Sequence, residues 1–232
     1  MEKYLIIYLA CPVLGFLVGG IPFGVILTAA RGIDIRTVAS GNIGATNVAR
    51  ALGRKWGYFC FLLDVLKGAV PTAAMGLLLA RWQLNDSPLG FLSWALVGSA
   101  AVLGHVFPVY LKFKGGKGVA TSAGVALALW PFYTLPALLA LLAWVLVTLA
   151  SRTVSAGSLA ACLTFLITYL AGFWIFDQQR WIIPPWSLQS QWPLLIAACL
   201  LPVLIIIRHR ANITRLLTGQ EHRIKTGQDN QR

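Results

Sequence analysis

Long apolar runs separated by short polar segments make up most of the chain. Seven of them predict membrane-spanning helices, at about 4–27, 56–80, 91–111, 118–130, 132–150, 157–176 and 192–207. Most approach the roughly 20 apolar residues that a helix needs to cross a bilayer. Pro131 separates the short fourth run from the fifth, and one helix over both would be too long for a simple crossing. The pattern predicts an all-α, polytopic membrane helix bundle: a single seven-span domain over 1–221 and a polar tail over 222–232.

The composition agrees with this fold class. Hydrophobic residues make up 58% of the 232 residues and charged residues only 11%, with a mean hydropathy of +0.74, whereas a soluble domain carries about 25% charged residues. All four cysteines lie within apolar runs and none has C-x-x-C spacing. Small buried hydrophobes fit them better than a disulfide framework or a zinc site.

The basic residues are distributed unevenly between the two sides of the predicted bundle. Of the 19 Lys and Arg residues, 15 fall in the segments 28–55, 112–117, 151–156 and 208–232, which seven spans place on one side. Lys3, Arg81 and Arg180 fall on the other side, and Lys67 lies inside the second span. By the positive-inside rule, this asymmetry predicts an external N-terminus and a cytoplasmic C-terminus. Topology signals and attraction to anionic lipid explain many of the basic loops, and nucleic acid is a poor partner for loops so short.

The segment "SGNIGATNVARALGRK", residues 40–55, combines glycine, small polar groups and cations. Gly41 and Gly44 permit tight turns and a close approach of the backbone to a ligand. Arg50 can bind an oxyanion with two parallel hydrogen bonds. Four side chains add neutral hydrogen-bonding groups: Ser40, Asn42, Thr46 and Asn47. An ordinary helix-capping loop remains the alternative, because Ser, Asn and Thr are common caps.

A second cationic segment, "HVFPVYLKFKGGKG", begins at His105 and leads into the fourth predicted span. Unpaired N–H groups at a helix start bind anions, and Lys117 adds a compact positive charge. Three glycines surround that lysine: Gly115, Gly116 and Gly118. The segment lacks the G-x-x-x-x-G-K-[ST] pattern of a nucleotide-binding loop. It therefore indicates phosphate without indicating a nucleotide, and a glycine-rich interfacial turn with snorkelling lysines is the alternative.

Two further polar segments fall on the same predicted side. "SRTVS" over 151–155 joins the fifth and sixth spans, and "RHRANITRLLTGQE" over 208–221 follows the last. The latter predicts a short amphipathic helix, which fits a membrane-surface helix as well as a binding segment. His209 and Asn212, three residues apart, share a side of it. Since all the anion-binding segments fall on one side, they predict one shared site there.

Asp64 and Lys67 lie one helical turn apart inside the second span. Ionisable groups at that depth usually face a polar interior. They fit either a structural ion pair or a role in orienting site residues.

The motifs "SGNIGATNVAR", "GHVFPVYLKFKGGKGVAT" and "NITRLLTGQE" together resemble those of the bacterial acyl-phosphate:glycerol-3-phosphate acyltransferases, integral membrane enzymes of phospholipid synthesis. The likeness runs from the first span to about Glu221, and the motifs occur in the same order. The resemblance implies transfer of a fatty acyl group from acyl phosphate to the 1-hydroxyl of glycerol 3-phosphate, giving lysophosphatidate and inorganic phosphate. It also implies seven spans with the site facing the cytoplasm, in a bacterial inner membrane.

Matched by motif position, the resemblance implies that Ser40, Arg50 and Lys117 bind phosphate. It extends the site to His105 in the central motif, and to three residues further along: Ser155, His209 and Asn212. The chain departs from the family pattern at two places: "TVSAGS" lacks the tyrosine that often precedes "VSLGS", and Ala211 stands where a glutamate is common. These departures concern the assignment of Ser155 and the histidines more than the reaction.

The implied chemistry suits these residue types. Two phosphate groups must be held close together, so cations and exposed backbone N–H groups are needed. We expect Lys117 and Arg50 to stabilise developing charge, and no metal or other cofactor is required. His105, His209 or a substrate phosphate oxygen is the candidate base for the hydroxyl proton.

Other function classes remain as alternatives. A membrane transporter of an organic phosphate would need sites near the midplane, preferably in related halves, and no convincing internal repeat is present. A lipid-binding scaffold does not require a loop as specific as "SGNIGATN". The expected partners are acyl phosphate, glycerol 3-phosphate, membrane lipid and, functionally, the soluble enzyme that makes acyl phosphate.

Overall fold

The computed structural model describes residues 2–84, 87–176 and 188–224. Within these ranges every regular element is a helix and no strand occurs. The described part contains six helical stretches long and apolar enough to cross a membrane, which are Glu2–Ala29, Arg54–Arg81, Pro88–Leu111, Thr134–Ser151, Val154–Gly172 and Gln189–Arg208. The predicted all-α membrane architecture is confirmed, and these stretches correspond to every predicted span except the fourth.

The first stretch is interrupted, which its continuous apolar sequence does not predict. It consists of α1 (Glu2–Leu5), a π-helix η1 (Ile6–Ala10), α2 (Cys11–Gly19) and α3 (Phe23–Ala29). Gly20, Ile21 and Pro22 separate α2 from α3, because proline lacks the N–H that would continue the helix. The ammonium of Lys67 donates a 2.8 Å hydrogen bond to the carbonyl oxygen of Ile21. A buried cation therefore satisfies a carbonyl that the break exposes.

Glycines let the central helices approach one another closely. α5 (Arg54–Arg81) packs on α7 (Val119–Ala128), and a Cβ at Gly68 would lie 2.2 Å from the carbonyl oxygen of Thr121. α6 (Pro88–Val106) packs on α2 in the same way, since a Cβ at Gly19 would lie 2.0 Å from the carbonyl oxygen of Ala101. Small residues at such contacts are typical of helix packing in membranes.

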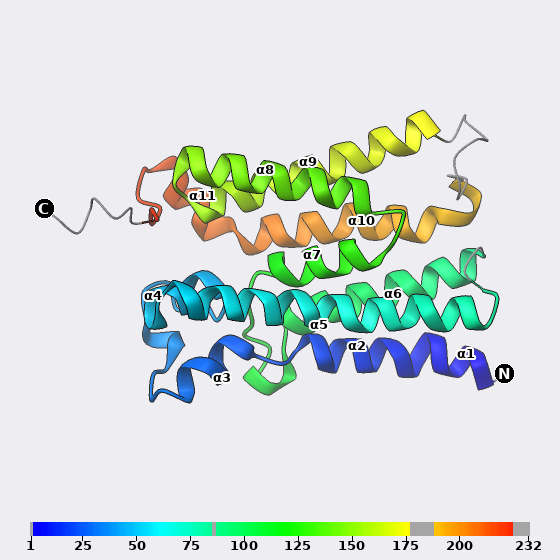
Figure 1. The fold of residues 1–232 in the computed structure, drawn as a ribbon, viewed down its shortest axis with the longest axis horizontal. Helices are drawn as coiled ribbons and strands as arrows, with labels where there is room; N and C mark the ends of the chain where they lie inside the picture. Colours follow the sequence, from blue (N-terminus) through cyan, green and yellow to red (C-terminus); the bar gives the residue numbers. More distant parts are fainter. Residues whose placement is uncertain (1, 85–86, 177–187, 225–232) are drawn as a thin grey trace, which may run out of the picture.

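The fourth predicted span is shorter than expected. Its helix α7 has ten residues, about 15 Å of helix, which is half of a hydrocarbon core about 30 Å thick. The preceding residues 112–118 form a loop and Pro131 lies in the turn that follows, so the helix cannot extend in either direction. Figure 1 shows the chain reversing direction between α6 and α7, and again before α8 (Thr134–Ser151).

The C-terminal half adds α9 (Val154–Phe176), α10 (Leu188–Arg208) and α11 (Arg210–Leu217). α8 and α9 pack along each other, and α10 contacts both α6 and α9. The predicted amphipathic helix after the last span is confirmed as α11. Of the segment 177–191 between the last two predicted spans, residues 177–187 lie outside the described residues, as does the tail beyond 224.

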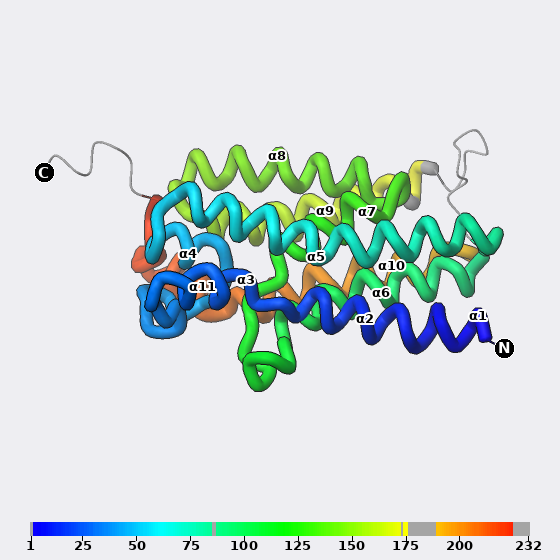
Figure 2. Tube along the Cα trace, turned by 60° about the horizontal axis from the view of Figure 1, so that its bottom comes forward, coloured from blue at the N-terminus to red at the C-terminus, as the bar shows by residue number. Residues whose placement is uncertain are grey.

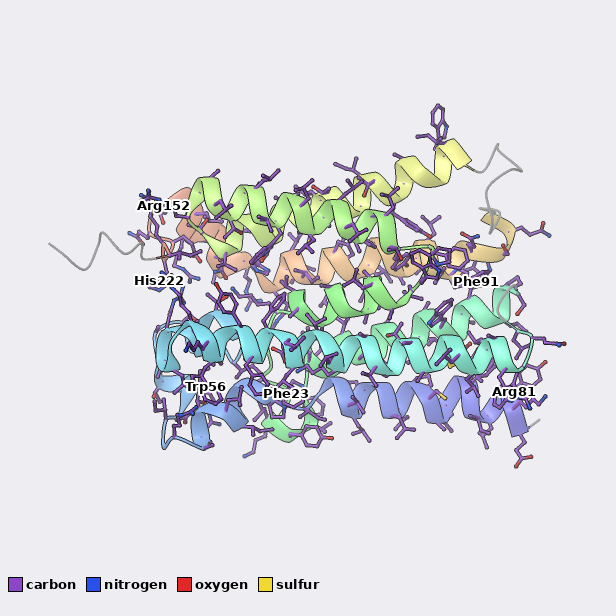
Figure 3. The ribbon with its side chains drawn as sticks, viewed as in Figure 1. Phe23, Trp56, Arg81, Phe91, Arg152 and His222 are labelled. Atoms are coloured by element: carbon purple, nitrogen blue, oxygen red, sulfur yellow. The ribbon has the colours of Figure 1, made fainter. Side chains whose placement is uncertain are left out.

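Short helices gather at one end of the bundle. α4 (Ala45–Leu52) and α11 lie there, and α1 lies at the opposite end, in both views of the chain (Figures 1 and 2). Trp56, Arg152 and His222 occupy the same end as α4, whereas Arg81 lies at the other (Figure 3). The polar segments singled out by sequence are thereby brought together.

Candidate active site

A polar cavity of about 130 Å³ lies at the end of the bundle that carries α4 and α11. The predicted site residues that line it come from four separate segments of the sequence, and they are Ser40, Asn42, Gly44, Thr46, Asn47, Arg50, His105, Lys117, Gly118, Ser155, His209 and Asn212. Of the predicted set, only Gly115 and Gly116 are not among the lining residues. The segments that the sequence predicted to share one site therefore line one cavity.

The first motif forms a tight loop followed by α4. Gly41 has φ +65°, a conformation that favours glycine. The side-chain oxygen of Asn42 accepts a 2.9 Å hydrogen bond from the N–H of Gly44, at the start of α4. A Cβ at Gly24 of α3 would lie only 1.8 Å from the carbonyl oxygen of Ile43. Close packing against α3 thus fixes the position of the loop.

Asn47 has a structural function that the sequence did not predict. Its amide nitrogen donates to the carbonyl oxygens of Ile35 and Val38, at 3.2 and 2.9 Å, and the residue is 1% exposed. These bonds hold a 3₁₀ turn, η2 (Ile35–Thr37), against α4. The amide nitrogen is therefore engaged with the backbone, although the residue lines the cavity.

The glycine-rich segment differs from the expectation at two positions. The N–H of Gly115 donates to the carbonyl oxygen of Val106 at 3.2 Å, and the N–H of Gly116 donates to the carbonyl oxygen of His105 at 3.0 Å. These N–H groups complete the end of α6 and do not face an anion, which corrects the prediction of direct binding by the two glycines. A Cβ at Gly116 would lie 2.0 Å from Nε2 of His105. Gly116 therefore provides space for the histidine ring.

Lys117 extends into the cavity and contacts α11. Its ammonium donates a 2.6 Å hydrogen bond to Oδ1 of Asn212. Burial lowers the pKa of Lys117 to about 8; Glu221 opposes this shift, while Arg215, Arg50 and Arg208 add to it. The lysine is thus still largely protonated near neutral pH, in a place where its charge is only partly balanced.

Glu221, which sequence reasoning did not assign to the site, is the centre of a hydrogen-bond network. Its Oε1 accepts hydrogen bonds from Ser155 Oγ at 2.7 Å and Asn212 Nδ2 at 2.8 Å, and its Oε2 accepts one from Arg215 Nε at 2.8 Å. Burial favours the neutral acid, but these bonds hold the pKa of Glu221 below its usual value. The carboxylate joins residues from α9 and α11. Its place at the end of the "NITRLLTGQE" motif was the available sequence signal.

The two histidines differ in environment. His209 is 2% exposed and Nδ1 lies 2.8 Å from the carbonyl oxygen of Ile205; a carbonyl only accepts, so Nδ1 carries the proton. Burial, and then the charge of Lys117, lower the pKa of His209 to about 4. His105 is also buried, and its Nδ1 lies 3.8 Å from Oδ1 of Asp64, too far for a hydrogen bond.

Asp64 and Lys67 form a buried ion pair at 2.7 Å. Asp64 also lines the cavity. The two residues therefore do form an ion pair, and a role in orienting site residues stays a prediction.

The cavity also has lining residues that the sequence did not assign to the site. They are Ala45, Phe61, Asp64, Val119, Ala120, Trp144, Val154, Ser158, Arg215, Glu221 and His222. His222, which the sequence assigned to the polar tail, thus lies at the cavity wall. A hydrogen bond ties this part of the chain to the bundle, since the N–H of Ile224 donates to the carbonyl oxygen of Arg152 at 2.8 Å. The described residues contain no group of three or more His, Cys, Asp or Glu side chains that could hold a metal ion.

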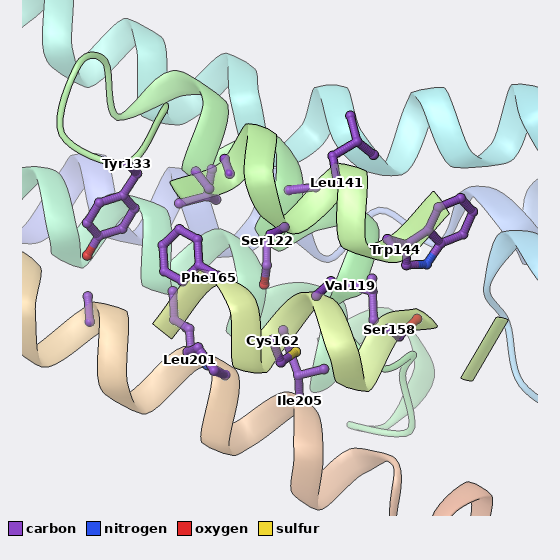
Figure 4. A pocket seen from close by; sticks show the side chains of 18 of the residues that line it. Val119, Ser122, Tyr133, Leu141, Trp144, Ser158, Cys162, Phe165, Leu201 and Ile205 are labelled. Carbon is purple, nitrogen blue, oxygen red and sulfur yellow. The ribbon is translucent and has the colours of Figure 1, made fainter. Parts of the chain in front are cut away.

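A second, apolar cavity of about 110 Å³ adjoins the polar one. The two share four lining residues, Phe61, Val119, Trp144 and Ser158. In Figure 4 the apolar cavity extends from Trp144 and Ser158 at one end to Tyr133 at the other, with Phe165 and Cys162 between them. Charged groups at one end and an apolar channel at the other can accommodate a molecule with an anionic head and a hydrocarbon tail.

Fold and site together define a multi-pass membrane protein with a cationic cavity that lies beside an apolar one. The family model described as glycerol-3-phosphate acyltransferase matches residues 9–219. The chain therefore belongs to the glycerol-3-phosphate acyltransferase family.

Individual relatives agree with this assignment. The glycerol-3-phosphate acyltransferase of Aquifex aeolicus is 41% identical over 214 residues, covering 91% of this chain and 96% of the relative. That of Myxococcus xanthus is 52% identical over 153 residues, covering 66% and 74%. A crystal structure of PlsY (YgiH), an integral membrane glycerol 3-phosphate acyltransferase in its glycerol 3-phosphate form, has a TM-score of 0.77 and 39% identity, covering 94% of this chain and 96% of that one.

Proposed function

We propose that this protein transfers a fatty acyl group from acyl phosphate to the 1-hydroxyl of glycerol 3-phosphate. The products are lysophosphatidate and inorganic phosphate. The observation that carries the proposal is the junction of the two cavities at Phe61, Val119, Trp144 and Ser158. An acyl phosphate has a carbonyl between a dianionic head and a hydrocarbon tail, so its carbonyl would lie at this junction. The solved relatives in glycerol 3-phosphate and lysophosphatidic acid forms support the same pair of molecules.

The charges of the polar cavity suit two phosphate groups. Arg50, Lys117 and Arg215 line it, against the carboxylates of Asp64 and Glu221. Asp64 is already neutralised by Lys67, which leaves an excess of positive charge. Arginine and lysine bind phosphate oxygens through charge-assisted hydrogen bonds. Ser40 and the loop that carries it add neutral donors at the cavity wall.

The reaction needs alignment and charge stabilisation more than a protein nucleophile. The hydroxyl oxygen attacks the acyl carbon, the bond from that carbon to the phosphate oxygen breaks, and phosphate departs with the bonding electrons. Lys117 and Arg50 stabilise the charge that develops on the carbonyl oxygen and the leaving phosphate.

A substrate phosphate oxygen accepts the hydroxyl proton in this proposal. A phosphate monoester has a second pKa near 6, whereas that of His209 is lowered to about 4. The phosphate is the stronger base of the two. His209, with its proton fixed on Nδ1, then has a positioning role and does not act as the base. His105 packs against Gly116.

We also propose seven passes, with the N-terminus outside and the site facing the cytoplasm of a bacterial inner membrane. The position of α1 and α11 at opposite ends of the bundle (Figure 1) supports an odd number of passes. The return of the chain through α7 and its flanking loops supplies the seventh. The excess of basic residues at the α4 end supports its cytoplasmic placement. The soluble enzyme that makes acyl phosphate would supply the donor from that side.

The test uses purified protein in detergent with glycerol 3-phosphate, and compares palmitoyl phosphate with palmitoyl-CoA as the donor. We expect lysophosphatidate and phosphate from palmitoyl phosphate alone. A folded protein that binds glycerol 3-phosphate but forms no product with either donor would contradict the proposal. Uptake of glycerol 3-phosphate into liposomes would then support the transporter alternative.

A further inference from the structure

The far end of the apolar cavity is closed by one aromatic residue. Tyr133 lines the cavity, lies at the end remote from Trp144 (Figure 4) and is 1% exposed. Its hydroxyl donates to the carbonyl oxygen of Leu194 in α10. Its ring packs edge-to-face on Phe165 and Tyr169, with centroids 5.2 and 5.0 Å apart. A ring held on two sides cannot turn aside without losing these contacts.

The rest of the cavity wall is less restrictive. Small side chains contribute much of it, including Ala126, Ala137 and Ala161. Leu141 lines the cavity and is nevertheless 46% exposed, so the side wall there faces the surrounding lipid. The cavity thus has a fixed end and a side that lipid can contact.

The length of the cavity can be taken from α8. Trp144 and Tyr133 lie eleven positions apart, which corresponds to about 16 Å of helix axis. An extended hydrocarbon chain advances roughly 1.3 Å per carbon, given carbon–carbon bonds near 1.5 Å. About twelve carbons therefore fit between the junction with the polar cavity and the Tyr133 ring.

From this geometry we infer that Tyr133 sets the length of acyl chain that the protein can bury, and so its donor preference. The inference rests on the proposed function. Each carbon up to about the twelfth gains burial in the cavity. Carbons beyond that point meet the ring of Tyr133 and must bend past Leu141 toward lipid, where they gain little further burial.

The experiment measures kcat/KM for acyl phosphates of 8 to 18 carbons in the unchanged protein and in each variant, and then takes the ratio of variant to unchanged protein at each length. This ratio cancels the partitioning of donors into detergent. We expect kcat/KM to rise with chain length in the unchanged protein and then level off near 12 carbons. Tyr133→Ala moves the plateau to longer chains, and raises the preference for the 18-carbon over the 12-carbon donor about tenfold.

Three further variants make the result decisive. Tyr133→Phe keeps the ring but loses the bond to Leu194, so its profile stays unchanged. Ala137→Leu fills the cavity one turn from Tyr133, so its plateau moves to shorter chains even if Tyr133→Ala fails to fold. Leu142→Ala removes an exposed side chain of α8 that does not line the cavity, so it should leave the profile unchanged and serves as the control.

An unchanged plateau in folded Tyr133→Ala, or in Ala137→Leu, would overturn the inference while leaving the proposed reaction intact. Absence of product from every acyl phosphate in the unchanged protein would instead overturn the proposed reaction.

Discussion

The polar and apolar cavities adjoin each other but are built by different means. The polar cavity depends on individual groups with defined partners, such as the 2.6 Å bond between Lys117 and Asn212 and the bonds from Ser155 and Arg215 to Glu221. The wall of the apolar cavity consists largely of alanine, leucine and aromatic side chains from five helices. Hydrogen-bonded charges need specific geometry, whereas apolar contacts depend mainly on volume. Substitutions should therefore have larger effects in the polar cavity.

The largest effect is expected for the buried ion pair at the wall of the polar cavity. Asp64→Asn leaves the buried ammonium of Lys67 without its carboxylate, and breaking such a pair costs about 3–5 kcal/mol. The measurement is the thermal unfolding midpoint in detergent. The matched control is Asp34→Asn, because the Asp34–Arg36 pair has a similar length, 2.8 Å, but is exposed. Equal midpoints for the two variants would contradict the prediction.

Next in size is the loss of the cavity lysine. Lys117→Ala should lower kcat/KM about 100-fold, since one charged hydrogen-bonding group aimed at a developing charge is worth roughly 3 kcal/mol. Lys114→Ala, which removes an exposed lysine from the same loop, is the control and should stay within about twofold. A comparable loss in both variants would show that the general positive potential matters, and not the position of Lys117.

A smaller effect is expected from pH. The pKa of Lys117 is lowered to about 8, so the ammonium is present below that pH and is lost as the pH rises through it. We therefore expect kcat/KM for glycerol 3-phosphate to fall above pH 8, by about tenfold per pH unit at most. Lys117→Arg keeps its charge over this range and should abolish the alkaline decline, whatever its absolute rate. A decline that persists in this variant would assign it to another group.

The smallest effect is expected in the apolar cavity. Leu201 lines its wall, and Leu201→Met conserves volume, so kcat/KM with a 12-carbon donor should change by less than about twofold. A loss as large as that of Lys117→Ala would remove the contrast between the two cavities. Lysophosphatidate formation is the measurement in both cases.

Hydropathy predicted most of the fold because crossing a membrane imposes a length and a composition on each helix. The predicted span 56–80 lies within α5 (Arg54–Arg81), and the span 132–150 agrees closely with α8 (Thr134–Ser151). Hydropathy did not predict the interruption of the first span at Ile21, because apolar residues lie on both sides of it. Nor did it predict α4, a short helix whose position depends on bonds from Asn47 to a distant turn.

For the site, too, the sequence predicted some features and missed others. Charge asymmetry and glycine-bearing motifs predicted which segments would meet, since topology alone places them on one side. Glu221 was missed as the link between α9 and α11, because Ser155 and Asn212 approach it only after the chain has folded. Gly115 and Gly116 were assigned to direct binding, but hydrogen bonds to the end of α6 engage their N–H groups.

By itself, the sequence determined the class of protein, the approximate spans and the segments that line one cationic cavity, because these depend on local composition and on the side of the membrane that each loop occupies. Only the tertiary structure decided how the two cavities join and which residue closes the apolar one. Tyr133 stands in the sequence as one aromatic residue among 26. Its position opposite Leu194, Phe165 and Tyr169 depends on contacts between helices far apart in the chain, which no local pattern records.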